Sequence, residues 1–111
     1  MIIYKGYRKE PENFASDNVI LVSADNGETW ANLPWGLEWV NHSPTGLNWG
    51  YHGSGCAQLA FAILHDFFQR AFKYSAEKAY KEIENGGYQE FKRAFVSRWG
   101  DTWEINEGAL S

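Results

Sequence analysis

The fold is decided by the stretch Asn41-His-Ser-Pro-Thr-Gly-Leu-Asn-Trp-Gly-Tyr-His-Gly-Ser-Gly-Cys-Ala-Gln58, which ends where an apolar helical pattern begins. It places several glycines around two aromatic residues, Trp49 and Tyr51. Glycines this close together indicate a backbone held in conformations that other residues resist, at an entropic cost. The stretch therefore predicts a shaped loop that leads into a helix, although the shape alone names no reaction.

Beyond the loop, apolar residues recur at spacings of three and four, which is typical of the buried face of an amphipathic helix. They are Cys56, Leu59, Ala60, Ile63, Leu64, Phe67, Phe68, Ala71 and Phe72. We expect Ser54 to cap the start of this helix. We expect His65 and Asp66 to lie on its opposite, solvated side.

The segment before the loop has the pattern of a small sheet. Residues 1–8, 18–23 and 28–33 are rich in β-branched and aromatic side chains, which favours strands. Residues 10–13 predict a turn. Asn26-Gly27 predicts a tight hairpin turn, because this pair tolerates positive φ at both positions.

The segment after the helix predicts two shorter helices. One covers residues 76–84, with Ser75 as its cap and a break at Asn85-Gly86-Gly87, and the other covers residues 88–99. Trp103 and Ile105 are expected to return to the core as a short extended piece, before a last turn capped by Asn106. The predicted fold class is α+β, with two to three N-terminal strands packed against two to three C-terminal helices. We expect one domain: sheet in residues 1–33, a Trp/Gly-rich loop in 34–55 and a helical part in 56–111.

Composition narrows the class of protein. The chain has 111 residues, of which 44% are hydrophobic and 17% aromatic, enough for one cored domain. Cys56 is the single cysteine, so no internal disulfide is expected and a reducing compartment is the simplest interpretation. No run approaches the roughly 20 apolar residues of a membrane span. We therefore expect a cytoplasmic protein without membrane contact.

The charge distribution carries more information than the net charge of −4. Between Lys9 and Arg70 there is no lysine or arginine, and this window holds seven carboxylates: Glu10, Glu12, Asp17, Asp25, Glu28, Glu38 and Asp66. Four of the six tryptophans fall in the same window. Such a surface repels phosphate backbones and attracts basic partners. A merely solubilising surface is an equally good interpretation.

The glycine-rich loop is also a candidate anion site, because first-turn amides at a helix start are unpaired. Its candidate residues are Gly50, Tyr51, His52, Gly53, Ser54, Gly55 and Gln58. The loop lacks the Lys and hydroxyl residues of phosphate-binding loops and the glycine spacing of a nucleophile elbow. Tight packing of the loop on the helix is the preferred interpretation.

No catalytic residue, metal ligand or cofactor is predicted. Cys56 with His42 or His52 could form a thiolate pair at the helix start, but Cys56 falls on the apolar face and is better interpreted as core. The three histidines, His42, His52 and His65, do not share a ligand spacing. Lys92, Arg93 and Arg98 form too weak a basic patch to predict nucleic-acid binding.

The central stretch resembles that of a known family of short bacterial, archaeal and phage proteins, a domain of unknown function. The resemblance rests on residues 41–64, on Tyr88-Gln-Glu-Phe-Lys92, on Trp103-Glu-Ile105 and on the opening Tyr4-Lys-Gly-Tyr-Arg8. The family pattern reads Ser-Pro-Thr/Asp-Gly-Phe-x-Trp-Gly-Tyr-Gly-Gly-Ser-Gly-Pro-Ala-Gln-Leu-Ala, and this chain departs from it at Leu47, His52 and Cys56. The family's proline at position 56 is typical of a first helical turn. The resemblance implies the fold and brings no activity.

Two functions of different classes follow from these patterns. The first is a small acidic, non-enzymatic protein that binds a basic, nucleic-acid-binding partner protein, in its sharpest form a phage-encoded inhibitor of a host defence complex. Its predicted contact residues are Asp25, Glu28, Trp35, Glu38, Trp39 and Trp49. The alternative is a small-ligand or anion-binding protein, or an enzyme, that uses residues 50–55. Direct nucleic-acid binding through exposed indoles is opposed by the charge map.

Overall fold

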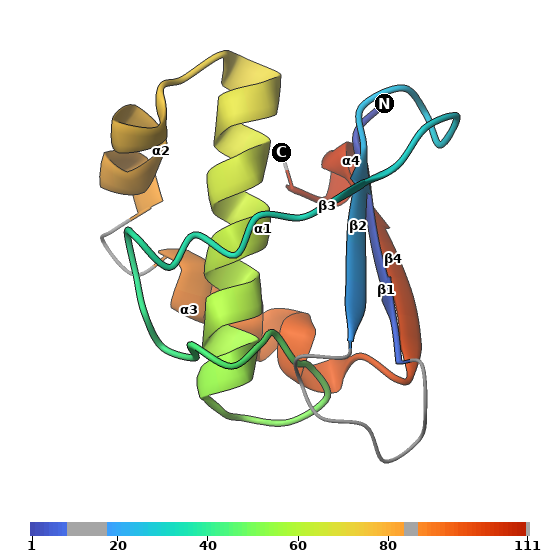
Figure 1. The fold of residues 1–111 in the computed structure, drawn as a ribbon, viewed down its shortest axis with the longest axis vertical. Coiled ribbons are helices and arrows are strands. Elements are labelled where there is room, and N and C mark those ends of the chain that lie inside the picture. The colour runs from blue at the N-terminus through green and yellow to red at the C-terminus, as the bar shows by residue number, and fades with distance from the viewer. Residues whose placement is uncertain (9–17, 84–86, 111) are drawn as a thin grey trace.

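The chain forms an antiparallel sheet with its helices packed on one face (Figure 1). This arrangement comes from a computed structural model that describes residues 1–8, 18–83 and 87–110. The elements in chain order are β1 (Ile3–Tyr7), β2 (Val19–Ser23), β3 (Ala31–Asn32), α1 (Ser54–Phe72), α2 (Ala76–Ile83), α3 (Gly87–Ala94), the 3-10 helix η2 (Val96–Arg98), β4 (Thr102–Asn106) and α4 (Glu107–Leu110). The predicted α+β class is confirmed. The turn predicted at residues 10–13 lies outside the described residues.

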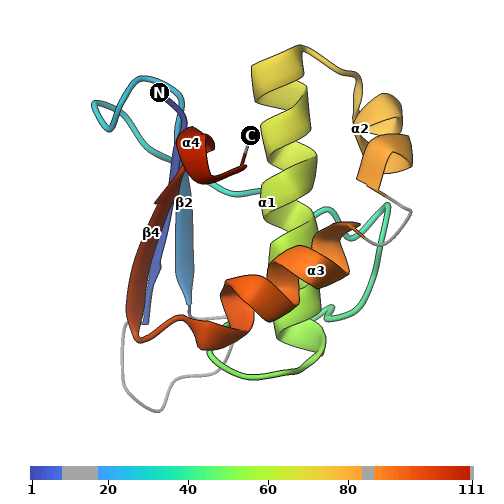
Figure 2. The same ribbon diagram turned by 180° about the vertical axis from the view of Figure 1, so that it is seen from behind.

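The sheet has the strand order β3-β2-β1-β4, with every pair antiparallel. Alternation along β1 and β4 decides which face is buried. Tyr4, Trp103 and Ile105 are buried against the helices, whereas Thr102 and Glu104 are exposed on the other face. Figure 2 shows the same division from behind, with helices on one side of the sheet only. The C-terminal extended piece predicted from Trp103 and Ile105 is therefore a full strand paired with β1.

The hairpin turn after β2 is confirmed, since Asn26 and Gly27 have φ of 61° and 89°. The strand that follows is shorter than expected. The Asp25 carboxylate accepts a hydrogen bond from the Thr29 amide at 2.8 Å, so the residues after Gly27 form a capped loop. Only Ala31–Asn32 remain to pair with β2.

Helix α1 confirms the apolar pattern, and one detail of its start corrects the prediction. The N-cap is Gly53, with extended backbone (φ −160°, ψ 178°) and no side-chain cap, while Ser54 is the first helical residue and is exposed. A side chain at Gly53 would collide with the ring of Tyr51. The aromatic ring, rather than a serine hydroxyl, therefore occupies the space beside the helix start.

The expected solvated position of His65 and Asp66 is wrong, because both are buried. The Tyr4 hydroxyl donates to Asp66 Oδ2 at 2.8 Å, and Arg70 Nε donates to the same oxygen at 2.7 Å. His65 Nε2 lies 2.8 Å from the carbonyl of Ala76. Since α1 packs between the sheet and the other helices, its polar side faces protein as well.

The remaining helices follow the predicted signals with shifted ends. Ser75 Oγ accepts the Lys78 amide at 3.1 Å and Asn106 Oδ1 accepts the Gly108 amide at 2.9 Å, so both predicted caps are confirmed. The helix expected over residues 88–99 stops at Ala94 and continues as η2. Of the predicted break, residues 85 and 86 lie outside the described residues.

Candidate functional site

A buried glutamine fixes the loop that carries two of the predicted contact tryptophans. Gln58 of α1 is fully buried. Its Oε1 accepts the amide of His42 at 2.8 Å, and its Nε2 donates to the carbonyl of Trp35 at 2.8 Å. One side-chain amide thus holds both ends of residues 34–42, here called the tryptophan loop, on α1. Gln58 was predicted as a ligand contact, and its hydrogen-bonding groups are occupied by this loop.

The inside of the tryptophan loop is equally constrained. The amides of Trp39 and Val40 both donate to the carbonyl of Gly36, at 3.0 and 3.2 Å. Gly36 has a φ of +75°, and a Cβ there would lie 2.9 Å from the Phe61 ring. Only glycine combines this backbone conformation with such close approach to α1.

The tryptophan loop presents a mixed aromatic and acidic surface. Trp35 and Trp39 are half-buried, and Glu38 between them is exposed. The Trp39 ring packs 5.3 Å from Tyr80 of α2. Glu38 forms no ion pair with any described residue. In Figure 1 the loop crosses α1 toward α2, on the side away from the sheet.

The other predicted contact residues lie elsewhere. Asp25 and Glu28 belong to the β2–β3 hairpin, which Figures 1 and 2 place at the sheet, apart from the tryptophan loop. Hydrogen bonds from Thr29 and Ser23 lower the pKa of Asp25 to about 2. This carboxylate therefore stabilises the turn to which it belongs. Trp49 is fully buried, and its ring cannot contact a partner in this conformation. The structure therefore brings together Trp35, Glu38 and Trp39 and separates them from the rest.

The glycine-rich loop is filled by protein atoms. A Cβ at Gly50, where φ is +85°, would lie 2.9 Å from the carbonyl oxygen of Trp99. A Cβ at Gly55 would lie 3.0 Å from Asn48 Cβ, and Gly53 accommodates Tyr51. Close packing therefore explains why glycine occupies these positions. Of the remaining ligand candidates, Tyr51, His52 and Ser54 are exposed.

The candidate nucleophile is poorly placed for chemistry. Cys56 is fully buried, and burial raises the pKa of its thiol, which disfavours the reactive thiolate. The Nε2 of His42 lies 2.9 Å from the hydroxyl of Tyr88. Within residues 1–8, 18–83 and 87–110, no group of three or more His, Cys, Asp or Glu side chains is arranged to hold a metal ion. None of the helices in those residues has the length and apolar character needed to cross a bilayer.

Sequence reasoning missed a polar cluster around Arg8. Its Nη2 donates to Asn48 Oδ1 at 2.9 Å and to the Trp49 carbonyl at 3.0 Å, and its guanidinium lies 4.4 Å from the centre of the Trp49 ring. Asn18 supports the same segment by donating to the Leu47 carbonyl at 2.9 Å. A lone arginine after a strand is a weak signal, because its partners lie some 40 residues away along the chain.

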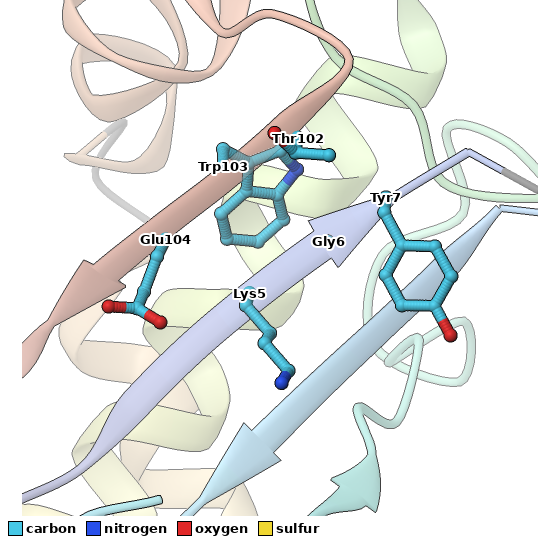
Figure 3. Close-up of a pocket in the computed structure, with 6 residues that line it drawn as sticks. All are labelled: Lys5, Gly6, Tyr7, Thr102, Trp103 and Glu104. Carbon is cyan, nitrogen blue, oxygen red and sulfur yellow. The ribbon is translucent and has the colours of Figure 1, made fainter.

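Sequence reasoning also missed a hollow on the outer face of the sheet, between β1 and β4 (Figure 3). It is lined by Lys5, Gly6, Tyr7, Thr102, Trp103 and Glu104. The alternation of β1 marks its outward residues, but the register with β4 is not visible in the sequence.

The comparisons with known proteins identify a family and no activity. No curated protein and no solved structure matches the chain. One protein-family model matches residues 4–111, which include the sheet, the tryptophan loop and the helices. The chain therefore belongs to that family, DUF6166, a family of unknown function.

Proposed function

We propose that this protein is a non-enzymatic binding protein that uses the tryptophan loop to bind a basic surface of a partner protein. The observation that carries the proposal is the double hydrogen bond of Gln58, which holds Trp35, Glu38 and Trp39 on α1. A fully buried amide used only to fix an exposed loop indicates that the shape of that loop matters.

The physical chemistry of the loop suits binding. A loop already held in one conformation loses little entropy when a partner binds, and this improves affinity. Partly exposed indoles such as those of Trp35 and Trp39 supply contact area, and tryptophan is enriched among residues that dominate binding energy. Glu38, which is exposed and has no ion pair in the part of the chain that the structure describes, adds long-range attraction to a cationic surface. Such attraction mainly speeds association.

A nucleic-acid-binding subunit is the expected class of partner, because its phosphate-binding surface is basic. A carboxylate on the tryptophan loop would take the place of a phosphate there. An inhibitor of a host defence complex is the sharpest form of this proposal. Its support is the overall negative charge together with the exposed Glu38.

The test is capture of a partner from host lysate on immobilised protein, followed by mass spectrometry. We expect Glu38→Lys and Trp39→Ala each to reduce capture strongly. Salt of about 1 M, which shortens the screening length to about 3 Å, should also weaken capture by the parent protein.

Matched controls come from the opposite side of the molecule. Trp30 is another half-buried indole, and Glu28 another exposed carboxylate, and both belong to the β2–β3 hairpin. Trp30→Ala and Glu28→Lys should leave capture unchanged. If the same proteins were recovered equally with Glu38→Lys and at high salt, binding through this loop would be disproved.

A further inference from the structure

The hollow between β1 and β4 has a floor of backbone and walls of side chains. Gly6 and Trp103 are directly paired in the register of the two strands. Gly6 has no side chain and Trp103 directs its indole toward the helices, where a Cβ on Gly6 would lie 2.5 Å from its Nε1. The outer face therefore retains a space of about 490 Å³ beside Tyr7 and Glu104.

The Glu104 carboxylate at this hollow does not pair with Lys5, the residue opposite it in the strand register. Lys5 and Glu104 are directly opposite each other, a position in which opposite charges usually attract. The Lys5 ammonium instead lies 3.9 Å from the centre of the Trp30 ring. Figure 3 shows the side chains of Lys5 and Glu104 pointing away from each other. Glu104 is exposed and forms no ion pair with any described residue.

Within residues 1–8, 18–83 and 87–110, strand β4 is also an edge of the sheet, since the strand order ends with it. An edge strand offers unpaired backbone N–H and C=O groups to an incoming extended segment. Thr102, Glu104 and Asn106 are all exposed on the outer face of this strand. Strand β4 thus offers backbone pairing at its edge and, at Glu104, a carboxylate without an ion pair among the described residues, while the hollow lies on the β1 side of the same strand.

We propose that the β4 edge binds an extended segment of a partner protein that carries a lysine or arginine opposite Glu104. The segment pairs with β4 as an additional strand. The aliphatic stem of that residue runs over the outer face of β4 and its cationic head reaches the Glu104 carboxylate, an arrangement that suits a snorkelling side chain. This proposal does not depend on the function of the tryptophan loop, which lies on a different face.

The same carboxylate argues against a second copy of this chain as the occupant. Full antiparallel pairing of Thr102–Asn106 with its own copy places Glu104 opposite Glu104 of that copy. Like charges directly opposite each other in a sheet are destabilising. Charge complementarity therefore favours a basic segment over self-association and over an acidic segment.

The test uses two synthetic heptapeptides, Thr-Val-Thr-Lys-Thr-Val-Thr and the same peptide with Glu in place of Lys, both with blocked ends. Titration is followed by the amide shifts of the labelled protein. We expect saturable shifts at Thr102–Asn106 and Tyr7, and binding of the Lys peptide about tenfold tighter than binding of the Glu peptide, or about 1.4 kcal/mol. Glu104→Lys should reverse this order, and Glu104→Gln should remove most of the difference.

Glu82→Lys is the matched control, because Glu82 is also exposed but lies on α2; it should keep the preference of the parent protein. Glu38→Lys should keep it too, which separates this proposal from the function of the tryptophan loop. Absence of β4 shifts with the Lys peptide overturns the proposal, as does equal binding of both peptides. Concentration-dependent broadening along β4 without peptide would overturn it in favour of self-pairing.

Discussion

The two hydrogen bonds from the Gln58 side chain to the tryptophan loop, here called the clamp, lead to a quantitative prediction for the substitution Gln58→Met. Methionine has a similar length and fills the same space in α1, so the substitution removes the amide without opening a large cavity. Both hydrogen bonds are lost, and the amide of His42 and the carbonyl of Trp35 lose their partner. The change therefore isolates the clamp from the packing of the helix.

The expected loss follows from the burial of Gln58 and from the two bonds of 2.8 Å. A buried backbone group left without a partner costs about 1–3 kcal/mol. His42 is exposed, so its amide regains water when the loop moves and falls at the lower end of that range. We expect a total loss of about 2–4 kcal/mol in the free energy of unfolding, or a fall of about 9–17 °C in Tm for a chain of this length.

Urea denaturation followed by circular dichroism measures the free energy, and hydrogen exchange at the His42 amide measures release of the loop. Gln89→Met on α3 is the matched control, because the side chain of Gln89 makes no hydrogen bond with any described residue. It should change stability by less than about 0.5 kcal/mol. If Gln58→Met were as mild as this control and left exchange at His42 unchanged, the clamp would not fix the loop.

Three further changes test other parts of the fold. Gly6→Ala places a Cβ 2.5 Å from Trp103 Nε1 and should lower the free energy of unfolding by about 1–3 kcal/mol, whereas an unchanged urea midpoint would show that the indole moves freely. The Asp25 carboxyl should titrate at about 2 by NMR, below its ordinary 3.8, because Thr29 donates to it; the stability it provides is present above about pH 4 and is lost as pH falls toward 2. Cys56 should resist alkylation in the native protein, because burial raises its pKa, and a rate equal to that of a free thiol would contradict this burial.

Local patterns were sufficient to predict most elements of the fold. The turn at Asn26 and Gly27 is determined by backbone preference at two adjacent residues, and both adopt the expected positive φ. The caps at Ser75 and Asn106 are likewise short-range, since each side chain bonds an amide within three residues. Signals of this kind are complete within a few positions of the sequence.

Burial of polar residues was not predictable in the same way. The sequence predicts Asp66 at the surface because it falls on the side of the helical pattern opposite the apolar positions. Its partner Tyr4 is 62 positions away and gives no local signal. The sequence predicts Gln58 as a ligand contact. In the fold, the backbones of Trp35 and His42 lie beside it and form hydrogen bonds with its amide. The exposure of each indole depends on the same long-range packing, which is why Trp49 was expected at the surface and is buried.

The place of β1 between β2 and β4 has a consequence for biosynthesis. Its second neighbour comes from the far end of the sequence, and the Glu107 amide donates to the Ile2 carbonyl at 2.9 Å. A nascent chain on the ribosome therefore exposes one side of β1 until Thr102–Asn106 have emerged. Such distant pairing slows folding and leaves an unpaired strand edge open to aggregation in the meantime.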